Sequence, residues 1–320
     1  MRRAVPVLIL IPCLVVALAL VASPHSKAET TADPVIAAAG DIACAPGTAK
    51  TVRTCHQAET SDLLVANASN YSAVLTLGDN QYDCGQASAF ASAYDPTWGR
   101  VKPLTHPVPG DGDYSGATCS TPGASGYFGY FGDAATPLDP GCASACRGYY
   151  SFDVGAWHIV ALNSECTEPG VGGCSATSPQ VQWLKADLAT HPAACTLAYF
   201  QRPVFRDAGG TVARTMRLFK VLYNAGAELI LVGNQHSYER YAPMSPSDTV
   251  DPANGVRQFV VGTGGRSQVK LAATPPLGAE VRNSGTFGVL ELTLHATSYD
   301  WRFDPEAGKT FTDSGAQACH

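Results

Sequence analysis

The stretch PVPGDGDY, residues 107–114, follows an apolar run and carries a Gly-Asp pair where the run ends. Two earlier apolar runs also end in Gly-Asp. In an open α/β sheet the carboxyl ends of the strands converge on one crevice, and glycine lets the backbone turn so that the next side chain points into it. Three such pairs in order predict a cation-binding site that contains Asp41, Asp79 and Asp111.

Two later strand ends add polar side chains to the same crevice. A fourth apolar run ends at Gln201 and Arg202, and a fifth leads into Gly-Asn-Gln-His, which contains Asn234 and His236. We expect these side chains to face the three aspartates, because all five runs are followed by polar residues at the same end.

Short apolar runs alternate with helix-like segments along the chain. Strand–helix alternation followed by antiparallel strands predicts an α/β sandwich with one principal domain. A Gly-, Ser- and Cys-rich stretch over 115–147 is expected to be an inserted loop region pinned by disulfides. The predicted strands are 35–39, 71–77, 101–108, 149–154, 157–163, 196–200, 229–232, 258–262, 289–294 and 298–303; the predicted helices are 60–68, one that opens at 178–179, and 211–224.

The N-terminus has the layout of a secretory signal peptide. Arg2 and Arg3 precede an apolar run over 5–22, and small residues follow at Ser26-Lys27-Ala28. This predicts a signal peptide over 1–28 and a mature, secreted domain over 29–320. An uncleaved N-terminal anchor is the alternative, because the apolar run is about long enough to span a bilayer.

Ten of the eleven cysteines lie beyond the predicted signal peptide. An even number of cysteines in an exported chain predicts disulfides. Cys44 with Cys55 and Cys166 with Cys174 are plausible local pairs, while the other pairings are open. A zinc–cysteine site is disfavoured because the spacings do not show two close cysteine pairs.

The charge pattern excludes one class of partner. The formal net charge is −6, and it becomes −9 when the predicted signal peptide leaves 18 basic residues against 27 acidic ones. There is no basic run or stripe, so nucleic acid is not expected as a partner. We expect a small-molecule substrate instead, and no membrane contact after cleavage.

The order and spacing of these motifs resemble those of the calcineurin-like metallophosphoesterases, particularly their secreted, purple-acid-phosphatase-like branch. The resemblance runs from about residue 35 to residue 303. It implies two packed mixed β-sheets flanked by helices, with a two-metal site at the strand ends. The segments that carry it are Gly78–Tyr82, Pro107–Tyr114, Tyr199–Pro203, Gly233–Arg240 and Gln258–Gly265.

The resemblance assigns the first metal to residues that this chain retains. Asp41 and His236 match first-metal ligands, and Asp79 matches the carboxylate that bridges both metals. Two carboxylates and an imidazole suit one Mn, Fe, Zn or Mg ion. Flanking motif positions are expected to support the site or its substrate: Asn80, Asp113, Tyr238 and Arg240.

The departures fall on the second metal and on the acid that assists the leaving group. The family's asparagine is Asp111, its acid histidine is Gly112, and its two further histidine ligands are Gln201 and Asn234. Oxygen donors would leave a weak second site that prefers Ca or Mg. The alternative is that these polar residues hydrogen-bond one another in a metal-free cleft. Arg202 could bind a phosphate or form a salt bridge.

Three functions remain open at this point. The first is weakened phosphate-ester hydrolysis by metal-activated water, in a site that lacks the acid histidine. The second is a catalytically inactive pseudo-phosphatase that binds a ligand or partner. The third is a lyase or cyclase that uses one divalent cation on the same fold.

Overall fold

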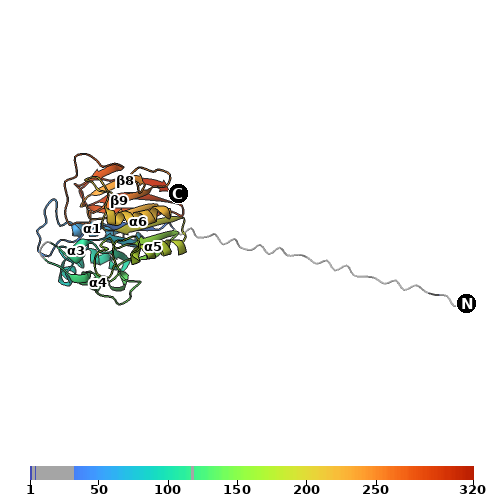
Figure 1. The fold of residues 1–320 in the computed structure, drawn as a ribbon, viewed down its shortest axis with the longest axis horizontal. Helices are drawn as coiled ribbons and strands as arrows, with labels where there is room; N and C mark the ends of the chain where they lie inside the picture. Colours follow the sequence, from blue (N-terminus) through green and yellow to red (C-terminus); the bar gives the residue numbers. More distant parts are fainter. Residues whose placement is uncertain (2–3, 5–31, 117–118) are drawn as a thin grey trace. The chain divides into compact units, whose positions relative to one another are not determined.

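Two mixed β-sheets form the centre of the protein (Figure 1). The computed structural model describes residues 1, 4, 32–116 and 119–320, so the predicted signal peptide falls almost wholly outside the described residues. The first sheet has the order β13-β12-β11-β1-β2-β3, in which β1, β2 and β3 run parallel. Its strands are β1 Val35–Ala39, β2 Tyr71–Leu77, β3 Thr105–Val108, β11 Gly288–Leu294, β12 Ser298–Pro305 and β13 Ser314–Ala318.

The second sheet has the order β10-β8-β9-β7-β6-β5-β4. Its four central strands, β5, β6, β7 and β9, are parallel, and antiparallel strands flank them. The two mixed sheets confirm the predicted fold class. The strands are β4 Tyr150–Val154, β5 Trp157–Ala161, β6 Cys195–Phe200, β7 Leu229–Val232, β8 Tyr238–Met244, β9 Val256–Val261 and β10 Ala279–Asn283.

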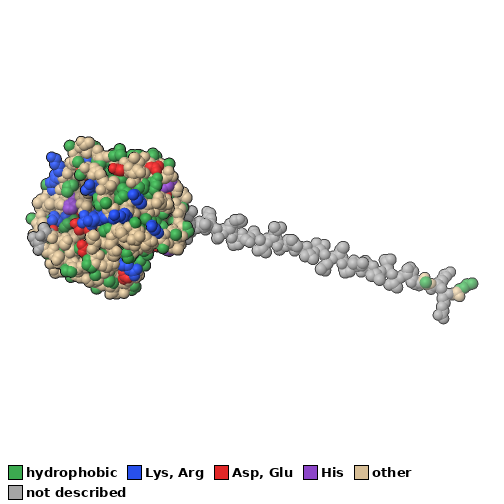
Figure 2. All heavy atoms as spheres, viewed as in Figure 1, with side chains coloured by type: hydrophobic (Ala, Val, Ile, Leu, Met, Phe, Trp, Pro, Cys, Tyr) green, Lys and Arg blue, Asp and Glu red, His purple; other side chains and the backbone are tan. Residues whose placement is uncertain are grey.

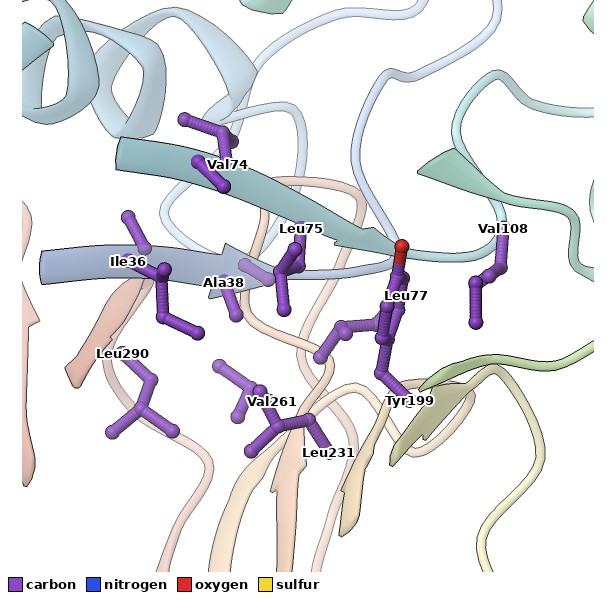
Figure 3. Close-up of a cluster of buried hydrophobic side chains, with 14 of the residues drawn as sticks. Ile36, Ala38, Val74, Leu75, Leu77, Val108, Tyr199, Leu231, Val261 and Leu290 are labelled. Carbon is purple, nitrogen blue, oxygen red and sulfur yellow. The ribbon is translucent and has the colours of Figure 1, made fainter. Parts of the chain in front are cut away.

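The core lies between the sheets and behind the second one. Figure 3 shows side chains of both sheets meeting in the buried layer between them, including Leu75, Tyr199 and Leu231. Alternate residues such as Ala198 and Ile230 belong to a second buried cluster, formed with helices α5 Pro179–Thr190 and α6 Ala213–Asn224. Because the central strands are buried on both faces, their sequences are continuous apolar runs.

The remaining helices are short, apart from α1 Gln57–Asn67. The expected loop region 115–147 contains helix α4 Ser125–Phe131, whose side chains Tyr127, Phe128 and Phe131 join the main core. The other helical segments are η1 Ala68–Asn70, α2 Ala87–Ala89, η2 Phe90–Tyr94, η3 Trp98–Leu104, α3 Asp111–Tyr114, η4 Pro122–Ala124 and η5 Gly132–Ala134.

Charges of both signs are interspersed on the surface. On the face shown in Figure 2, Lys and Arg side chains form a short row, and acidic and histidine side chains lie beside it. Within the part of the chain that the structure describes, no helix combines the length and the apolar composition needed to cross a membrane.

Five disulfides pair the ten cysteines from Cys44 to Cys319. The two local pairs expected from the sequence are confirmed, and the zinc–cysteine alternative is excluded for these ten. The pairs are Cys44–Cys55, Cys84–Cys119, Cys142–Cys146, Cys166–Cys174 and Cys195–Cys319. The last of them spans 124 positions and joins the start of β6 to the chain beyond β13.

Replacing both Cys195 and Cys319 by Ser should destabilise the protein far more than replacing Cys142 and Cys146. Loop-closure entropy predicts about 5 kcal/mol for the long loop and about 2 kcal/mol for the loop of Cys142–Cys146, which spans only 4 positions. Denaturant unfolding of the two double variants measures the difference. Equal losses of unfolding free energy would show that chain entropy does not govern these two disulfides.

Candidate metal centre

The carboxyl ends of β1, β2 and β7 deliver three polar residues in a backbone conformation that non-glycine residues rarely adopt. Asp41, Asp79 and Asn234 each follow a glycine and have φ angles of 58°, 50° and 65°. Such conformations cost of order 1–3 kcal/mol each and persist where the surroundings enforce them. Their common position after three strands indicates that the side chains are aimed at one place for a functional reason.

Four donor atoms meet at this place. The Tyr82 hydroxyl donates to Asp41 Oδ1 at 2.8 Å and also contacts Asp79 Oδ2. His236 Nε2 lies 3.2 Å from Asp41 Oδ1 and 3.2 Å from the Tyr82 hydroxyl. The structure thus brings together the three ligands expected for the first metal and adds a tyrosine to them.

These separations fit a single cation. Around an octahedral ion with bonds of about 2.1 Å, neighbouring ligand atoms lie roughly 3 Å apart. The oxygen and nitrogen atoms of Asp41, Tyr82 and His236 are already at such distances from one another. A metal ion could therefore be held by this set with little rearrangement of the side chains.

Each ligand is oriented by a contact through its other polar atom. The backbone N–H of Asn234 donates to Asp41 Oδ2 at 2.7 Å, and that of Gly112 donates to Asp79 Oδ1 at 2.7 Å. His236 Nδ1 is hydrogen-bonded to Ser267 Oγ at 2.5 Å, which leaves Nε2 facing the carboxylates. Support of this kind is characteristic of metal ligands, because it fixes the orientation of each side chain.

The electrostatics of the cluster favour a cation. Burial raises the pKa of Asp79 well above its usual value, and the nearby Asp41, Asp111 and Asp113 raise it further. Burial and the same Asp41 and Asp79 carboxylates raise the pKa of Tyr82. A bound cation would offset this repulsion and favour the ionised carboxylates and phenolate.

Tyr82 is the functional candidate that the sequence prediction missed. It belongs to the motif Gly78–Tyr82, but the sequence does not predict it as a metal ligand. The available signal was its position three residues after Asp79, within one motif at one strand end. A phenolate is a hard anionic oxygen ligand, so Tyr82 adds to the oxygen donors that a divalent cation could use here.

In the second half of the site, where the resemblance places the second metal, the side chains of Asp111, Gln201 and Asn234 are hydrogen-bonded to one another. Gln201 Nε2 donates to Asp111 Oδ1 and to Asn234 Oδ1, both at 2.9 Å. Arg202 Nη2 pairs with Asp111 Oδ2 at 3.1 Å. The structure therefore brings Asp111, Gln201 and Asn234 together, in the mutually hydrogen-bonded arrangement that was the alternative to a second metal.

Asp113 and Asn80 connect the loops that follow β2 and β3. The buried Asp113 carboxylate accepts hydrogen bonds from the Asn80 side chain at 3.0 Å and from the backbone N–H groups of Asn80, Gln81 and Gly110. Burial raises the pKa of Asp113 to about 6, against the effect of these donors. Both residues thus support the strand ends from within the protein.

Gly112 allows helix α3 to approach Asp79 closely. A Cβ atom at this position would lie 3.0 Å from the carboxyl carbon of Asp79, which is closer than nearly all such contacts in proteins. Although Gly112 has no side chain, its backbone N–H donates to Asp79 Oδ1 and so helps to hold this carboxylate in position.

Tyr238 and Arg240 do not support the metal loop, which corrects the sequence-based prediction. Both side chains bind Asp313, through Tyr238 Oη at 2.7 Å and Arg240 Nε at 2.7 Å. Arg240 also pairs with Glu280. These residues belong to β8, which leads away from the strand end, so they join that strand to the C-terminal segment.

A cleft of about 480 Å³ opens beside the cluster. Arg266 lines it, lying 4.8 Å above the Tyr82 ring and 3.2 Å from Asp83. The cleft therefore combines acidic groups with one cationic wall. Its lining residues are Asp79, Tyr82, Asp83, Asp111, Gly112, Ser115, Gly116 and Arg266.

A second group of potential ligands, separate from the predicted set, consists of His158, Asp187 and His191, whose donor atoms lie within 4.8 Å of one another. His158 is held between Asp153 and Asp187, at 2.9 Å from each. Burial acts to lower the pKa of His158, but the two carboxylates raise it overall. We interpret this group as an ion-paired cluster that fixes α5 against β5.

Comparison with known proteins identifies the fold. No family model matches the chain. Over 135 residues the chain is 30% identical to purple acid phosphatase 22 of Arabidopsis thaliana, a match that covers 40% of this chain and 30% of the relative.

Two solved structures share the architecture. Purple acid phosphatase PPD1 from yellow lupin (Lupinus luteus) seeds aligns with a TM-score of 0.69 at 16% identity, over 89% of this chain and 53% of that one. GAP50, the anchor in the inner membrane complex of Plasmodium, aligns with a TM-score of 0.61 at 13% identity, over 88% of each chain.

This chain thus spans about half the length of the lupin phosphatase and less of the Arabidopsis protein. The chain therefore has the fold of the calcineurin-like metallophosphoesterases.

Proposed function

We propose that this protein is a metal-dependent phosphoesterase that holds one metal ion firmly and hydrolyses small phosphate esters slowly. The observation that carries the proposal is the convergence of Asp41, Asp79, Tyr82 and His236 on one point at the strand ends. The similarity to two purple acid phosphatases supports the choice of reaction class.

The bound cation and the protein would make different contributions to catalysis. A cation bound by these four residues would supply Lewis-acid polarisation of a phosphoryl oxygen and a lowered pKa of water. The protein's own contribution is to hold the ligands in place through the backbone of Gly112 and Asn234 and through Ser267. Arg266 adds positive charge to the cleft in which a phosphate ester would lie.

The weak point of the site is proton transfer to the leaving group. Gly112 has no side chain, and the neighbouring Asp111 is engaged by Gln201 and Arg202. His106 cannot take over the task, because its ring stacks on Phe152 at 3.9 Å and burial lowers its pKa to about 4. Loss of positioned acid catalysis costs about 10²–10⁴-fold in rate.

Export from the cell is part of the proposal. Five disulfides suit an oxidising compartment, which agrees with the signal peptide expected from the sequence.

A catalytically inactive, ligand-binding protein is the alternative function. One observation favours it: the side chains in the second half of the site are hydrogen-bonded to one another. A binding role on this fold has a precedent in GAP50, which is described as an anchor.

The purified protein should contain about one tightly bound metal ion per chain. Asp79→Asn should abolish that binding, because Asp79 supplies a donor atom at the centre of the cluster. If the metal is ferric iron, Tyr82→Phe should also remove a visible phenolate-to-metal absorption band. Elemental analysis and absorption spectroscopy check both expectations.

Tyr238→Phe is the matched control, since it removes a buried hydroxyl that bonds to Asp313 instead of the cluster. Metal content and spectrum should stay unchanged in this control. Two tightly bound ions in the unmodified protein, or a metal content that Asp79→Asn does not lower, would contradict the single-metal proposal.

Activity should depend strongly on the leaving group. We expect measurable hydrolysis of p-nitrophenyl phosphate, whose leaving group needs no acid, and rates on alkyl phosphates lower by about 10²-fold or more. Comparison of kcat/KM for the two substrates in metal-loaded protein checks this. Alkyl phosphates cleaved as fast as the aryl ester would reveal an acid other than those considered.

Restoring the second-metal ligands of the related family should raise metal content and catalytic activity together. The combined variant Asp111→Asn, Gln201→His and Asn234→His supplies the expected ligands and leaves Gly112 in place, where a larger residue would displace Asp79. The three changes should act as a unit, so single variants should gain little. A gain in activity without a second equivalent of metal would contradict this expectation.

A further inference from the structure

The second half of the site contains a cation of its own. Arg202 follows the end of β6, and its guanidinium lies between two carboxylates, with Nη2 3.1 Å from Asp111 Oδ2 and Nε 2.6 Å from Glu165 Oε1. An arginine stays protonated in proteins. The positive charge is therefore a permanent part of this half of the site.

The arginine is held in place by buried groups. Glu165 is 3% exposed, and the Arg202 backbone N–H donates to Ser164 Oγ at 3.0 Å. The Arg202 side chain itself is 25% exposed, so part of it remains accessible. A guanidinium that two carboxylates fix in a partly exposed side chain can still offer its remaining N–H groups to a phosphate or carboxylate.

The surrounding residues do not fit a second metal ion. Gln201 presents its Nε2 donor, not its carbonyl oxygen, to Asp111 and Asn234. An amide N–H₂ group cannot bind a cation. A metal would have to break both of these hydrogen bonds and displace Arg202 from Asp111. At the first site a metal would replace only the proton that the Tyr82 hydroxyl shares with Asp41 and Asp79.

We propose that the Arg202 guanidinium takes the place of the second metal ion and binds the phosphoryl group of the substrate. This inference rests on the proposed phosphoesterase function for the identity of the anion. It makes the centre a one-metal, one-arginine site for phosphate esters, in which the Arg202–Asp111 ion pair keeps a second divalent cation out.

Arg202→Gln tests both halves of the proposal. Removal of the positive charge releases Asp111 Oδ2, while Gln201 still holds Oδ1, so the variant should bind a second equivalent of Mn²⁺ that is weaker than the first and that the unmodified protein does not bind. Its affinity for inorganic phosphate should fall roughly 10- to 100-fold, as expected for loss of a charge-assisted contact. Calorimetric titration of the metal-loaded proteins with Mn²⁺ and with phosphate measures both effects.

Arg214→Gln is the matched control. Arg214 Nη1 approaches the other Glu165 oxygen at 3.6 Å, while the Arg202 pair with Asp111 is untouched. This variant should keep one metal and nearly unchanged phosphate affinity. Arg202→Lys retains the charge and should still exclude the second metal. Thermal unfolding of each variant establishes that it is folded.

The outcomes separate this inference from the proposed function. Exclusion of the second metal by Arg202 stands even if no ester is hydrolysed, because stoichiometry and phosphate affinity are measured without turnover. Two Mn²⁺ equivalents in the unmodified protein, or a phosphate affinity that Arg202→Gln leaves unchanged, would overturn the inference. If either result is found and the protein still hydrolyses phosphate esters slowly, the proposed phosphoesterase function would stand and the proposed role of Arg202 would not.

Discussion

The candidate site depends on the way buried carboxylates are stabilised at the ends of neighbouring strands. Asp41, Asp79 and Asp113 are all nearly or fully buried, and charges of one sign repel one another strongly in such surroundings. Backbone N–H groups from Asn234, Gly112 and other loop residues hold them in fixed positions. The loops that follow β1, β2, β3 and β7 are thereby tied to one another through these three side chains.

The two halves of the site meet the same electrostatic demand in different ways. Around Tyr82, the Asp41 and Asp79 carboxylates share one centre with the tyrosine hydroxyl and His236, while Arg266 contacts only the face of the Tyr82 ring, so a metal ion would supply the missing counter-charge. Around Asp111, Arg202 supplies the counter-charge and Gln201 supplies hydrogen bonds. Under the proposed function, Arg202 would thus take the place of a second metal in the half of the site where the related family has histidines and this chain has Gln201 and Asn234.

Much of the fold could be predicted because buried parallel strands have an unmistakable pattern. The runs 35–39, 71–77 and 229–232 are strands with the predicted bounds, and the consecutive strands β4 and β5, and β11 and β12, form antiparallel pairs near the predicted ranges. Strands β8, β10 and β13 were not predicted from the sequence. These strands lie at or near sheet edges, and their polar and apolar residues alternate only weakly. Helix α4 was hidden by its glycines, although its aromatic residues are buried.

The sequence alone determined which residues come to the strand ends, because Gly-Asp and Gly-Asn pairs after apolar runs fix both the turn and the direction of the next side chain. Only the tertiary structure decided how those residues combine. Three features depend on contacts between segments far apart in the chain. Tyr82 joins Asp41 in the cluster, and Arg202 pairs with Asp111. Tyr238 and Arg240 bind Asp313 instead of the metal loop. Local sequence patterns carry no information about such contacts, because side-chain partners are chosen when the sheets pack.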